Sequence, residues 1–522
     1  MNKYSTLLLA GAVALSFASC QKDNTSGVVN PDSAVGTFAS IKASEAGLRA
    51  VTDGQQDAAG VGGESLIANG TFYAKAPSTV TGATVTGLTF TPAVQGVETY
   101  WQTAVFKYTG ETGNDINSAL ALNGLASTPA LGADTEVQIT DLSNLAAETG
   151  FTMTSASATT INILPDIAQT DVKAGTNQFD YTVERVVSKV QVAQSSSFVK
   201  GLAGEIKDLR YAVAGSAKEA YYFLDNAGNR TLDKDTPKNG YGTAYKSAID
   251  AVPASTFKGG EDLSGLRDLQ KVSDKSLVAV GDQDGKWATL NSLPLTEDNV
   301  AVANKESSTE GIFFLENSMA GFTPAADNSF KYADITYVKI YGTYVPGDNE
   351  VWTLDKSNPK NPNPGLIPVS AAEVAKERKE TVEKDGTSKE YTWKAGSFFK
   401  GDQTGKLYLT LEAARHDGNT TSQLYEGGKM VWLTPANKQV DNGVTVYPFT
   451  RRNNIYSLSI DAIKNFGDNF DPIDPTDPNI PKPENPDEPV TPPDTPVDTH
   501  DTSIQVRAAI LNWNLVSRGV NL

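Results

Sequence analysis

The chain is poor in the side chains that most enzymes use for nucleophilic and metal chemistry. Its 522 residues include a single cysteine, Cys20, and two histidines, His416 and His500. A Ser/His/Asp hydrolase needs a histidine beside its nucleophile, and zinc sites draw on clusters of histidine and cysteine. The sequence also lacks a nucleotide-binding loop and a nucleophile elbow. We therefore expect no enzyme and no cofactor, and the lone cysteine excludes an intramolecular disulfide.

Two further chemistries have weak signals. The runs DQDG at residues 282–285 and DNAG at residues 225–228 resemble parts of calcium loops. Neither has the full spacing with a closing glutamate, so solvated turns explain them and no metal is expected. Tyr100, Trp101 and Trp432 could stack on sugar rings, but aromatic residues buried in a sheet give the same pattern.

The cysteine has a chemical role of its own. Lys3 precedes an apolar run that ends at Phe17, and two small residues stand directly before Cys20. The run is too short for a bilayer span and is typical of a secretory signal. It resembles a bacterial lipoprotein signal, with Phe17 departing from the usual leucine. We expect residues 1–20 to be the signal peptide and Cys20 the site of lipidation and signal cleavage, rather than an incidental cysteine after a plain signal.

A short strand and an arginine follow the signal. Residues 21–34 are polar and indicate a flexible tether, and the run from Val35 to Ile41 alternates as a strand does. Arg49 lies at the exit of this run, ahead of a stretch rich in glycine and alanine. Loops of small residues are where proteases cut. From these residues alone, Arg49 is either a protease site or an ordinary surface arginine.

The charge balance excludes two classes of partner. The chain has 44 Lys and Arg residues against 62 Asp and Glu residues, a formal net charge of −18. Phosphate backbones need lysine and arginine, so binding of nucleic acid is not expected. Electrostatic attraction to an anionic membrane is excluded for the same reason.

Short alternating runs rich in Val, Thr, Tyr and Gly favour a mostly β protein. Turn signals between the runs fit β-sandwiches. We expect an N-terminal sandwich over residues 50–195 and a C-terminal sandwich over residues 196–467. Short helices are expected at residues 142–149 and 371–380.

The chain ends with a tether and a long apolar strand. Residues 468–501 are rich in proline and aspartate, which predicts an extended, solvated segment. Residues 502–522 alternate as a half-buried strand and then change phase, so we expect a bulge or kink near residue 510. The apolar positions are Ile504, Val506, Ile510, Leu511, Trp513 and Leu515. Such a strand is an aggregation hazard unless it joins a sheet. We expect that sheet in another copy of the protein, and the alternative is that the strand closes the second sandwich of its own chain.

Several ordered motifs together resemble one family. They are the signal that ends at Cys20, VERVVSKV (183–190), EIKDLRYAVA (205–214), TYVKIYGTY (336–344), GSFFKGDQTGKLYL (396–409), RRNNIYSLSIDAIKNFG (451–467), the Asp-Pro tether and AAILNWNL (508–515). On these residues the chain resembles a shaft subunit of the short (minor) fimbriae of Porphyromonas-type bacteria, in the FimA-like Bacteroidales pilin superfamily.

The resemblance implies two transthyretin-like β-sandwich domains and a removable N-terminal strand. The precursor would reach the outer membrane as a lipoprotein, and an arginine-specific protease would cut it after Arg49, leaving Ala50 as the mature N-terminus. Lys42 is the alternative cut. Residues 21–49 would be a propeptide, and residues 502–522 the donor strand that fills a neighbouring subunit's opened groove.

The partners that the resemblance implies are other copies in a filament, accessory tip and anchor subunits, and host or bacterial surface receptors. The implied roles are adhesion, coaggregation and biofilm formation by cell-surface fimbriae. Two alternatives stay open, a glycan-binding outer-membrane lipoprotein and a tip or anchor subunit of the same fimbria. The tether and terminal strand favour the shaft, since a monomeric glycan binder has no use for them.

The lipoprotein hypothesis predicts that a palmitate analogue labels the wild-type protein in cells and does not label the Cys20→Ser variant. The reason is that lipid attachment at this position needs the Cys20 thiol, which the variant lacks. Equal labelling of both proteins, seen by in-gel fluorescence, would contradict acylation at this residue.

Overall fold

The computed structural model describes residues 36–45, 56–59, 67–77, 82–95, 98–125, 145–147, 150–155, 159–214, 216–217, 222, 267–268, 278–279, 281–282, 312–315, 336–384, 387–437, 440–441, 444–445, 450, 452–469 and 504–514. Within these ranges the chain is mostly β, with several sheets and two short α-helices, α1 (Ala371–Val374) and α2 (Leu411–His416). The prediction of a mostly β protein is therefore confirmed. None of the helices in these ranges is long and apolar enough to cross a bilayer.

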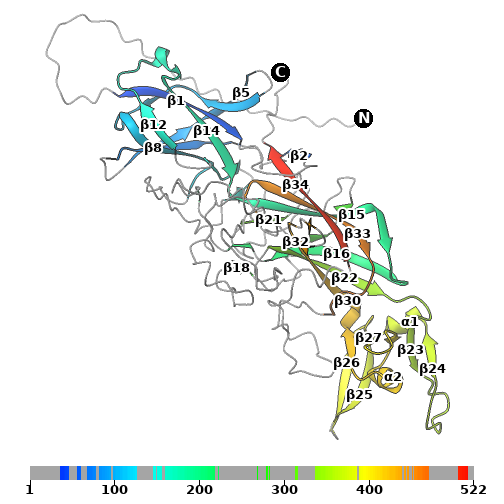
Figure 1. The fold of residues 1–522 in the computed structure, drawn as a ribbon. Helices are drawn as coiled ribbons and strands as arrows, with labels where there is room; N and C mark the ends of the chain where they lie inside the picture. Colours follow the sequence, from blue (N-terminus) through cyan, green and yellow to red (C-terminus); the bar gives the residue numbers. More distant parts are fainter. Residues whose placement is uncertain are drawn as a thin grey trace, which may run out of the picture. The chain divides into compact units, whose positions relative to one another are not determined.

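The N-terminal part of the described chain forms a sheet of eleven strands (Figure 1). Along its main path the strands are β4 (Ala83–Leu88), β3 (Gly70–Lys75), β8 (Gly113–Leu122), β11 (Met153–Ser155), β14 (Asn177–Arg185), β1 (Thr37–Glu45), β6 (Glu98–Thr103) and β5 (Phe90–Gln95). Three more strands branch from it, β12 (Thr159–Ile163) beside β8, β13 (Lys173–Ala174) beside β14, and β7 (Phe106–Tyr108) beside β1.

Aromatic residues from distant strands fill the interior of this sheet. Phe72 is fully buried, and its ring stacks on Phe179 with the centroids 6.2 Å apart and the planes at 7°. Tyr108 and Tyr181 meet the same Phe72 ring edge-on, at 6.1 and 6.2 Å. The hydroxyls of Tyr181 and Ser118 lie 2.5 Å apart, so the buried phenol has a polar partner. The alternation of these residues along β3 and β14 is what directs them inward.

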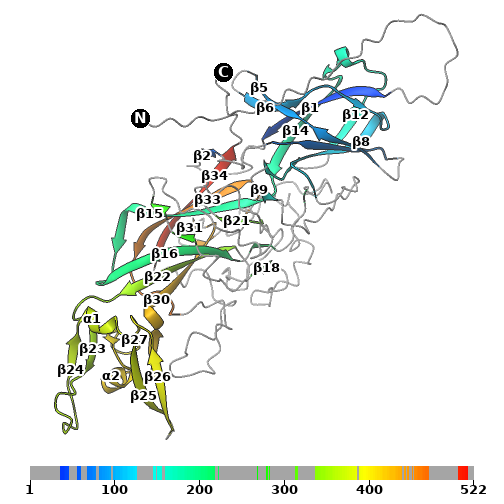
Figure 2. The same cartoon turned by 180° about the vertical axis from the view of Figure 1, so that it is seen from behind.

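Two further sheets follow along the chain. One has six strands, with β2 (Gln56–Ala59), β34 (Ile504–Asn514), β33 (Asn454–Ile463), β15 (Ser188–Lys200) and β20 (Gly281–Asp282) in order, and β21 (Ile312–Phe314) beside β15. The other has four strands, β19 (Val278–Ala279), β16 (Glu205–Ala214), β22 (Tyr337–Val345) and β30 (Lys429–Pro435). Short pairs complete this region, β9 (Ala146–Ala147) with β10 (Gly150–Phe151), β17 (Ser216–Ala217) with β18 (Arg267–Asp268), and β31 (Val440–Asp441) with β32 (Val444–Thr445). Figure 2 shows β15, β33 and β34 from behind.

A small unit with its own core lies between β22 and β30 in the sequence. It contains a five-stranded sheet of β24 (Leu366–Val369), β23 (Val351–Leu354), β28 (Leu407–Tyr408), β27 (Phe398–Gly401) and β29 (Ser422–Tyr425), and a hairpin of β25 (Arg378–Lys384) and β26 (Thr387–Trp393). Trp393 and Phe399 belong to a hydrophobic cluster separate from the main one. The buried Glu380 carboxylate accepts hydrogen bonds from Trp393 Nε1 and from two backbone N–H groups at the start of α2, which fixes the helix against the hairpin.

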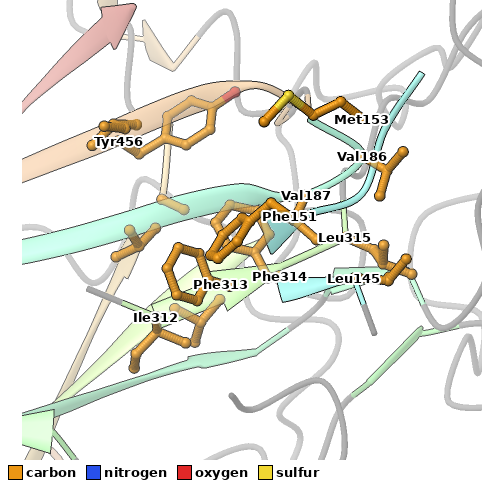
Figure 3. Packing of buried hydrophobic residues seen from close by; sticks show 14 of the residues in the cluster. Leu145, Phe151, Met153, Val186, Val187, Ile312, Phe313, Phe314, Leu315 and Tyr456 are labelled. Atoms are coloured by element: carbon orange, nitrogen blue, oxygen red, sulfur yellow. The ribbon is translucent and has the colours of Figure 1, made fainter. Parts of the chain in front are cut away.

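Side chains from several strands pack together in the main cluster. Figure 3 shows Leu145, Phe151 and Met153 with Ile312, Phe313, Phe314 and Leu315, and also Val186, Val187 and Tyr456. The rings of Phe151 and Phe313 lie edge to face with their centroids 4.8 Å apart. This packing makes the main cluster a shared core.

The segment 179–192 divides into β14 and β15, because Val186 N–H donates to the Thr152 carbonyl (3.1 Å) and Asn453 N–H donates to the Val187 carbonyl (2.9 Å). Residue 196, at which the C-terminal sandwich was expected to begin, lies within β15.

Both expected helices are reduced or absent in the described ranges. The helix expected over residues 142–149 is wrong, since Ala146–Ala147 pair with β10. The helix expected over residues 371–380 is confined to α1, because the Arg378 guanidinium donates to the Leu409 and Ser397 carbonyls (2.8 and 2.7 Å) and draws the chain into β25.

Phe72→Ala is predicted to destabilise the eleven-stranded sheet by about 3–5 kcal/mol, because it removes the ring that three other aromatic rings contact. Hydrogen exchange of the amides of β8, the strand paired with β3, measures the change. Val199→Ala is the control, since Val199 is 58% exposed, and it should shift stability by less than about 0.5 kcal/mol. Equal exchange rates in both variants would contradict the central role of Phe72.

Candidate functional site

The strand expected to be removable, β1, is an interior strand of the eleven-stranded sheet. On one edge it runs parallel to β14, with Ser40 opposite Gln178 and Glu45 opposite Val183. On the other edge it is antiparallel to β7 at its start and to β6 further along. The prediction that the run from Val35 to Ile41 pairs within the first sheet is confirmed for residues 37–41.

Alternate side chains of β1 enter the core. Thr37, Ala39, Ile41 and Ala43 are each at most 1% exposed. Three of these four are small, which lets β1 fit beside the aromatic residues of neighbouring strands. Burial raises the pKa of Tyr108 on β7 to about 12, so its phenol is neutral at physiological pH. Removal of β1 would expose an apolar groove between β14 and the β6–β7 segment.

The first residue of β1 is held by a buried polar network. The Thr37 hydroxyl donates to the Leu164 carbonyl (2.8 Å) and accepts from Ile167 N–H (3.1 Å) and Asn177 Nδ2 (3.0 Å). Asn177 Nδ2 also lies 3.0 Å from the Phe38 carbonyl oxygen. Asn177 has a φ of 56°, in the left-handed region that asparagine tolerates better than most residues. The sequence analysis missed this network, although an asparagine after Gly175 at the start of a β run is a signal for such a turn.

The expected cleavage residues, Arg49 and Ala50, lie outside the described residues, as do Cys20 and Leu515. The structure does place what flanks the cleavage segment. β1 ends at Glu45 in the eleven-stranded sheet, and β2 begins at Gln56 in the six-stranded sheet. A cut between these two strands would separate β1 from every other strand of its sheet.

The terminal strand, β34, lies in the structure on a sheet of its own chain. It pairs antiparallel with β33 from Ile504 opposite Ile463 to Asn512 opposite Asn454. Its far end also pairs in parallel with β2, from Leu511 opposite Gln56 to Asn514 opposite Ala59. The expected donor residues Ile504, Val506, Ile510, Leu511 and Trp513 all lie within this strand.

The bulge expected near residue 510 is wrong. The register of β34 against β33 is continuous through Ile510 and Leu511, and the irregularity lies on β33, between Ile460 and Ala462. The extra residue therefore belongs to the partner strand. A change of apolar phase in the sequence did not require a break in the backbone pairing.

The aromatic residues considered for sugar stacking are mostly buried. Trp101 is 5% exposed and Trp432 is 2% exposed, so neither presents a face to a sugar. Residues 225–228, expected as a turn, and residues 283–285 lie outside the described ranges. Among the residues that are described, no three His, Cys, Asp or Glu side chains gather as a metal site would need.

Lys42, the alternative cleavage residue, has paired strands on both sides, which predicts how a protease will treat it in the folded precursor. Lys42 is in register with Asp180 on one side and Gln102 on the other, so its main chain cannot enter a protease as an unpaired extended segment. A lysine-specific protease should leave Lys42 intact in the folded precursor and cut there after denaturation. Mass spectrometry of the fragments measures this, and the exposed Lys360 is the positive control. Rapid cutting at Lys42 in the native protein would show that β1 opens easily.

Comparisons with known proteins give structural likenesses. No protein-family model matches the sequence, and no curated protein matches it. A protein of Parabacteroides distasonis described as a candidate cell adhesion protein matches 93% of this chain and 99% of its own, with 14% identity and a TM-score of 0.41. A fimbrilin of Porphyromonas gingivalis W83 matches 93% of this chain and 100% of its own, with 14% identity and a TM-score of 0.38. Over nearly its whole length, the chain is thus similar in structure to Bacteroidales fimbrilins and cell adhesion proteins.

Proposed function

We propose that this protein is a structural fimbrial subunit that polymerises by protease-triggered strand exchange. The observation that carries the proposal is the position of β1, an interior strand that precedes the segment holding Arg49. A cut after Arg49 leaves β1 held by non-covalent contacts alone. Its loss opens a groove with main-chain hydrogen-bonding groups on both walls, which only another strand can satisfy.

The connection to the terminal strand supports donation to a second copy. Ile463 and Ile504 lie opposite each other in antiparallel strands, an arrangement that a turn of about 2–5 residues can join. The chain instead places residues 464–503 between them, including the Asp-Pro tether. An extended proline-rich segment of this length reaches on the order of 100 Å at about 3 Å per residue. The first residues of the connection are held within the chain, since Asp468 pairs with Val431 on β30, and the length beyond them suits transfer of β34 to a neighbour.

In this proposal, β34 pairs with β33 only before assembly and is later transferred to another copy. An unpaired apolar strand would aggregate before assembly, and β33 would itself be an exposed edge. On transfer, β34 gives up one set of main-chain hydrogen bonds and gains another in the groove of the next copy. The net driving force then comes from burying apolar side chains in the vacant groove, about 1.5–3 kcal/mol for each large one.

The proposal also covers the localisation, maturation and partners of the protein in the cell. We propose a lipid-anchored precursor at the outer membrane with Cys20 acylated, followed by cleavage between Arg49 and Ala50 and incorporation into cell-surface fimbriae. Its partners would be further copies, tip and anchor subunits and the maturation protease. Adhesion to host or bacterial receptors would follow from the filament, and two transthyretin-like sandwiches would form the body of each subunit.

The test is electron microscopy of precursor cut by an arginine-specific protease. Wild-type protein should form filaments, whereas Arg49→Ala should stay monomeric because β1 remains attached. Deletion of residues 502–522 should give a folded monomer after the cut, since the groove finds no donor.

Val506→Asp is the matched single change, because it places a charge where the donor must become buried. Circular dichroism of each variant confirms folding. Filaments of normal length from the deletion variant would overturn the donor role, and a deletion variant that fails to fold would show that β34 belongs to its own chain.

A further inference from the structure

We propose that the groove selects its donor strand through a hydroxyl clamp, and that the donor enters with Thr502 in the place of Thr37 and Arg507 in the place of Lys42. The hydroxyl clamp is made by Asn177 Nδ2, the Ile167 N–H and the Leu164 carbonyl. This inference rests on the proposed function and specifies the register of the exchange.

The clamp is saturated by one hydroxyl. A threonine hydroxyl has one hydrogen to donate and two lone pairs to accept with, and Thr37 uses all three, at 2.8, 3.1 and 3.0 Å. Thr37 is 1% exposed and Asn177 is 3% exposed, so water does not share these contacts. The backbone at the next residue is held as well, since Phe38 N–H donates to the Ile167 carbonyl (3.1 Å) and the Phe38 carbonyl accepts from Asn177.

Departure of β1 leaves this polar cluster without its central partner. The Ile167 N–H would lose its acceptor, and a buried donor without an acceptor is costly. Asn177 Nδ2 keeps the Leu164 carbonyl, 2.9 Å away. A strand that carries valine at the clamp position fills the space and leaves the Ile167 N–H without an acceptor. The clamp therefore favours a strand with serine or threonine at that position.

A second contact of β1 lies five residues further along. Lys42 Nζ lies 4.1 Å from the centroid of the Tyr100 ring, a cation–π contact on the outer side of β1. A donor strand that reproduces both contacts of β1 would carry a cationic residue five positions after its hydroxyl residue.

The terminal segment offers three hydroxyl residues, Thr502, Ser503 and Ser517. Five residues after them stand Arg507, Ala508 and Leu522. Thr502 alone is followed by a cation at the spacing of Thr37 and Lys42. In this register the inward positions of Ala39, Ile41 and Ala43 are taken by Ile504, Val506 and Ala508.

One competing register fits the sizes of the first three inward residues better, although it places Asn512 at Ala43. Val506 in the place of Thr37 puts Ala508 at Ala39 and Ile510 at Ile41. That arrangement leaves the clamp facing a valine and sets Leu511, which has no charge, over Tyr100. In the Thr502 register, Ile504 is larger than Ala39, and the smaller Val506 in the place of Ile41 compensates for part of the added volume. A buried N–H group without an acceptor has no comparable compensation.

The clamp is tested first in the precursor itself. After cutting with an arginine-specific protease, the released β1 segment should dissociate about tenfold faster or more from Thr37→Val than from wild type. Thr37→Ser should restore slow release, which a purely steric role for the methyl group would not give. Ser44→Ala, on the same strand, is the matched control. Release from Thr37→Val at the wild-type rate would overturn the clamp.

The register is tested by assembly. Thr502→Val should slow filament growth of cut protein about tenfold or more, and Thr502→Ser and Ser503→Ala should not. Asn177→Gly keeps the positive φ and removes the amide, so in that background Thr502→Val should have a much smaller effect.

Equal growth of Thr502→Val and wild type would overturn the register, and so would equal effects of Thr502→Val with and without Asn177. Failure of cut wild-type protein to form filaments would instead overturn the proposed function, and with it Thr502 as the donor residue. The release experiment decides the clamp in either case, so the two failures are distinguishable.

Discussion

The structure depends on a constraint of backbone hydrogen bonding, which is that an interior strand must satisfy two neighbours at once. β1 supplies main-chain partners to β14 on one edge and to β7 and β6 on the other. A peripheral strand can be lost at the cost of one ladder, whereas loss of β1 opens two. Loss of β1 therefore leaves main-chain groups unpaired on both walls of the groove, and a strand that enters the groove restores both ladders at once.

The same constraint applies in the six-stranded sheet, where the terminal strand β34 covers an edge of β33. β33 has β15 as a parallel neighbour on one edge, and β34 covers the other edge. β2, which follows the cleavage segment, covers only the last residues of β34. The terminal strand is thus held along one edge throughout and along the other only at its end. Over residues 504–510, β34 therefore has one ladder to break, whereas β1 has two.

The sequence predicted those features that depend on local alternation. Residues 454–463 form β33 with the expected bounds, and Glu205–Ala214 form β16. The partner of β1 could not be predicted, because the parallel pairing with β14 joins residues about 140 positions apart and leaves no local pattern. The hydroxyl clamp was missed for a similar reason, since Thr37, Leu164 and Asn177 meet only after the sheet forms.

The second hydrophobic cluster was also hidden in the sequence. Its residues Val382 and Trp393 lie in hairpin strands rich in charged side chains, and the cluster forms where Glu380 caps α2. The phase change at residue 510 misled the sequence analysis, because apolar periodicity reports which side chains are buried and does not report backbone continuity. Partial burial of both faces of a strand produces the same signal as a bulge.

The order in which the strands are synthesised has a consequence for folding. β1 can pair with β7 and β6 first, but its second edge stays open until β14 has been synthesised, more than 130 residues later. The six-stranded sheet likewise includes β2 and β34, which lie far apart in the sequence. Contacts that span such separations form late and slowly. Both sheets are therefore completed only after most of the chain has been synthesised, and a β1 edge left open in the meantime is a site where another strand could pair.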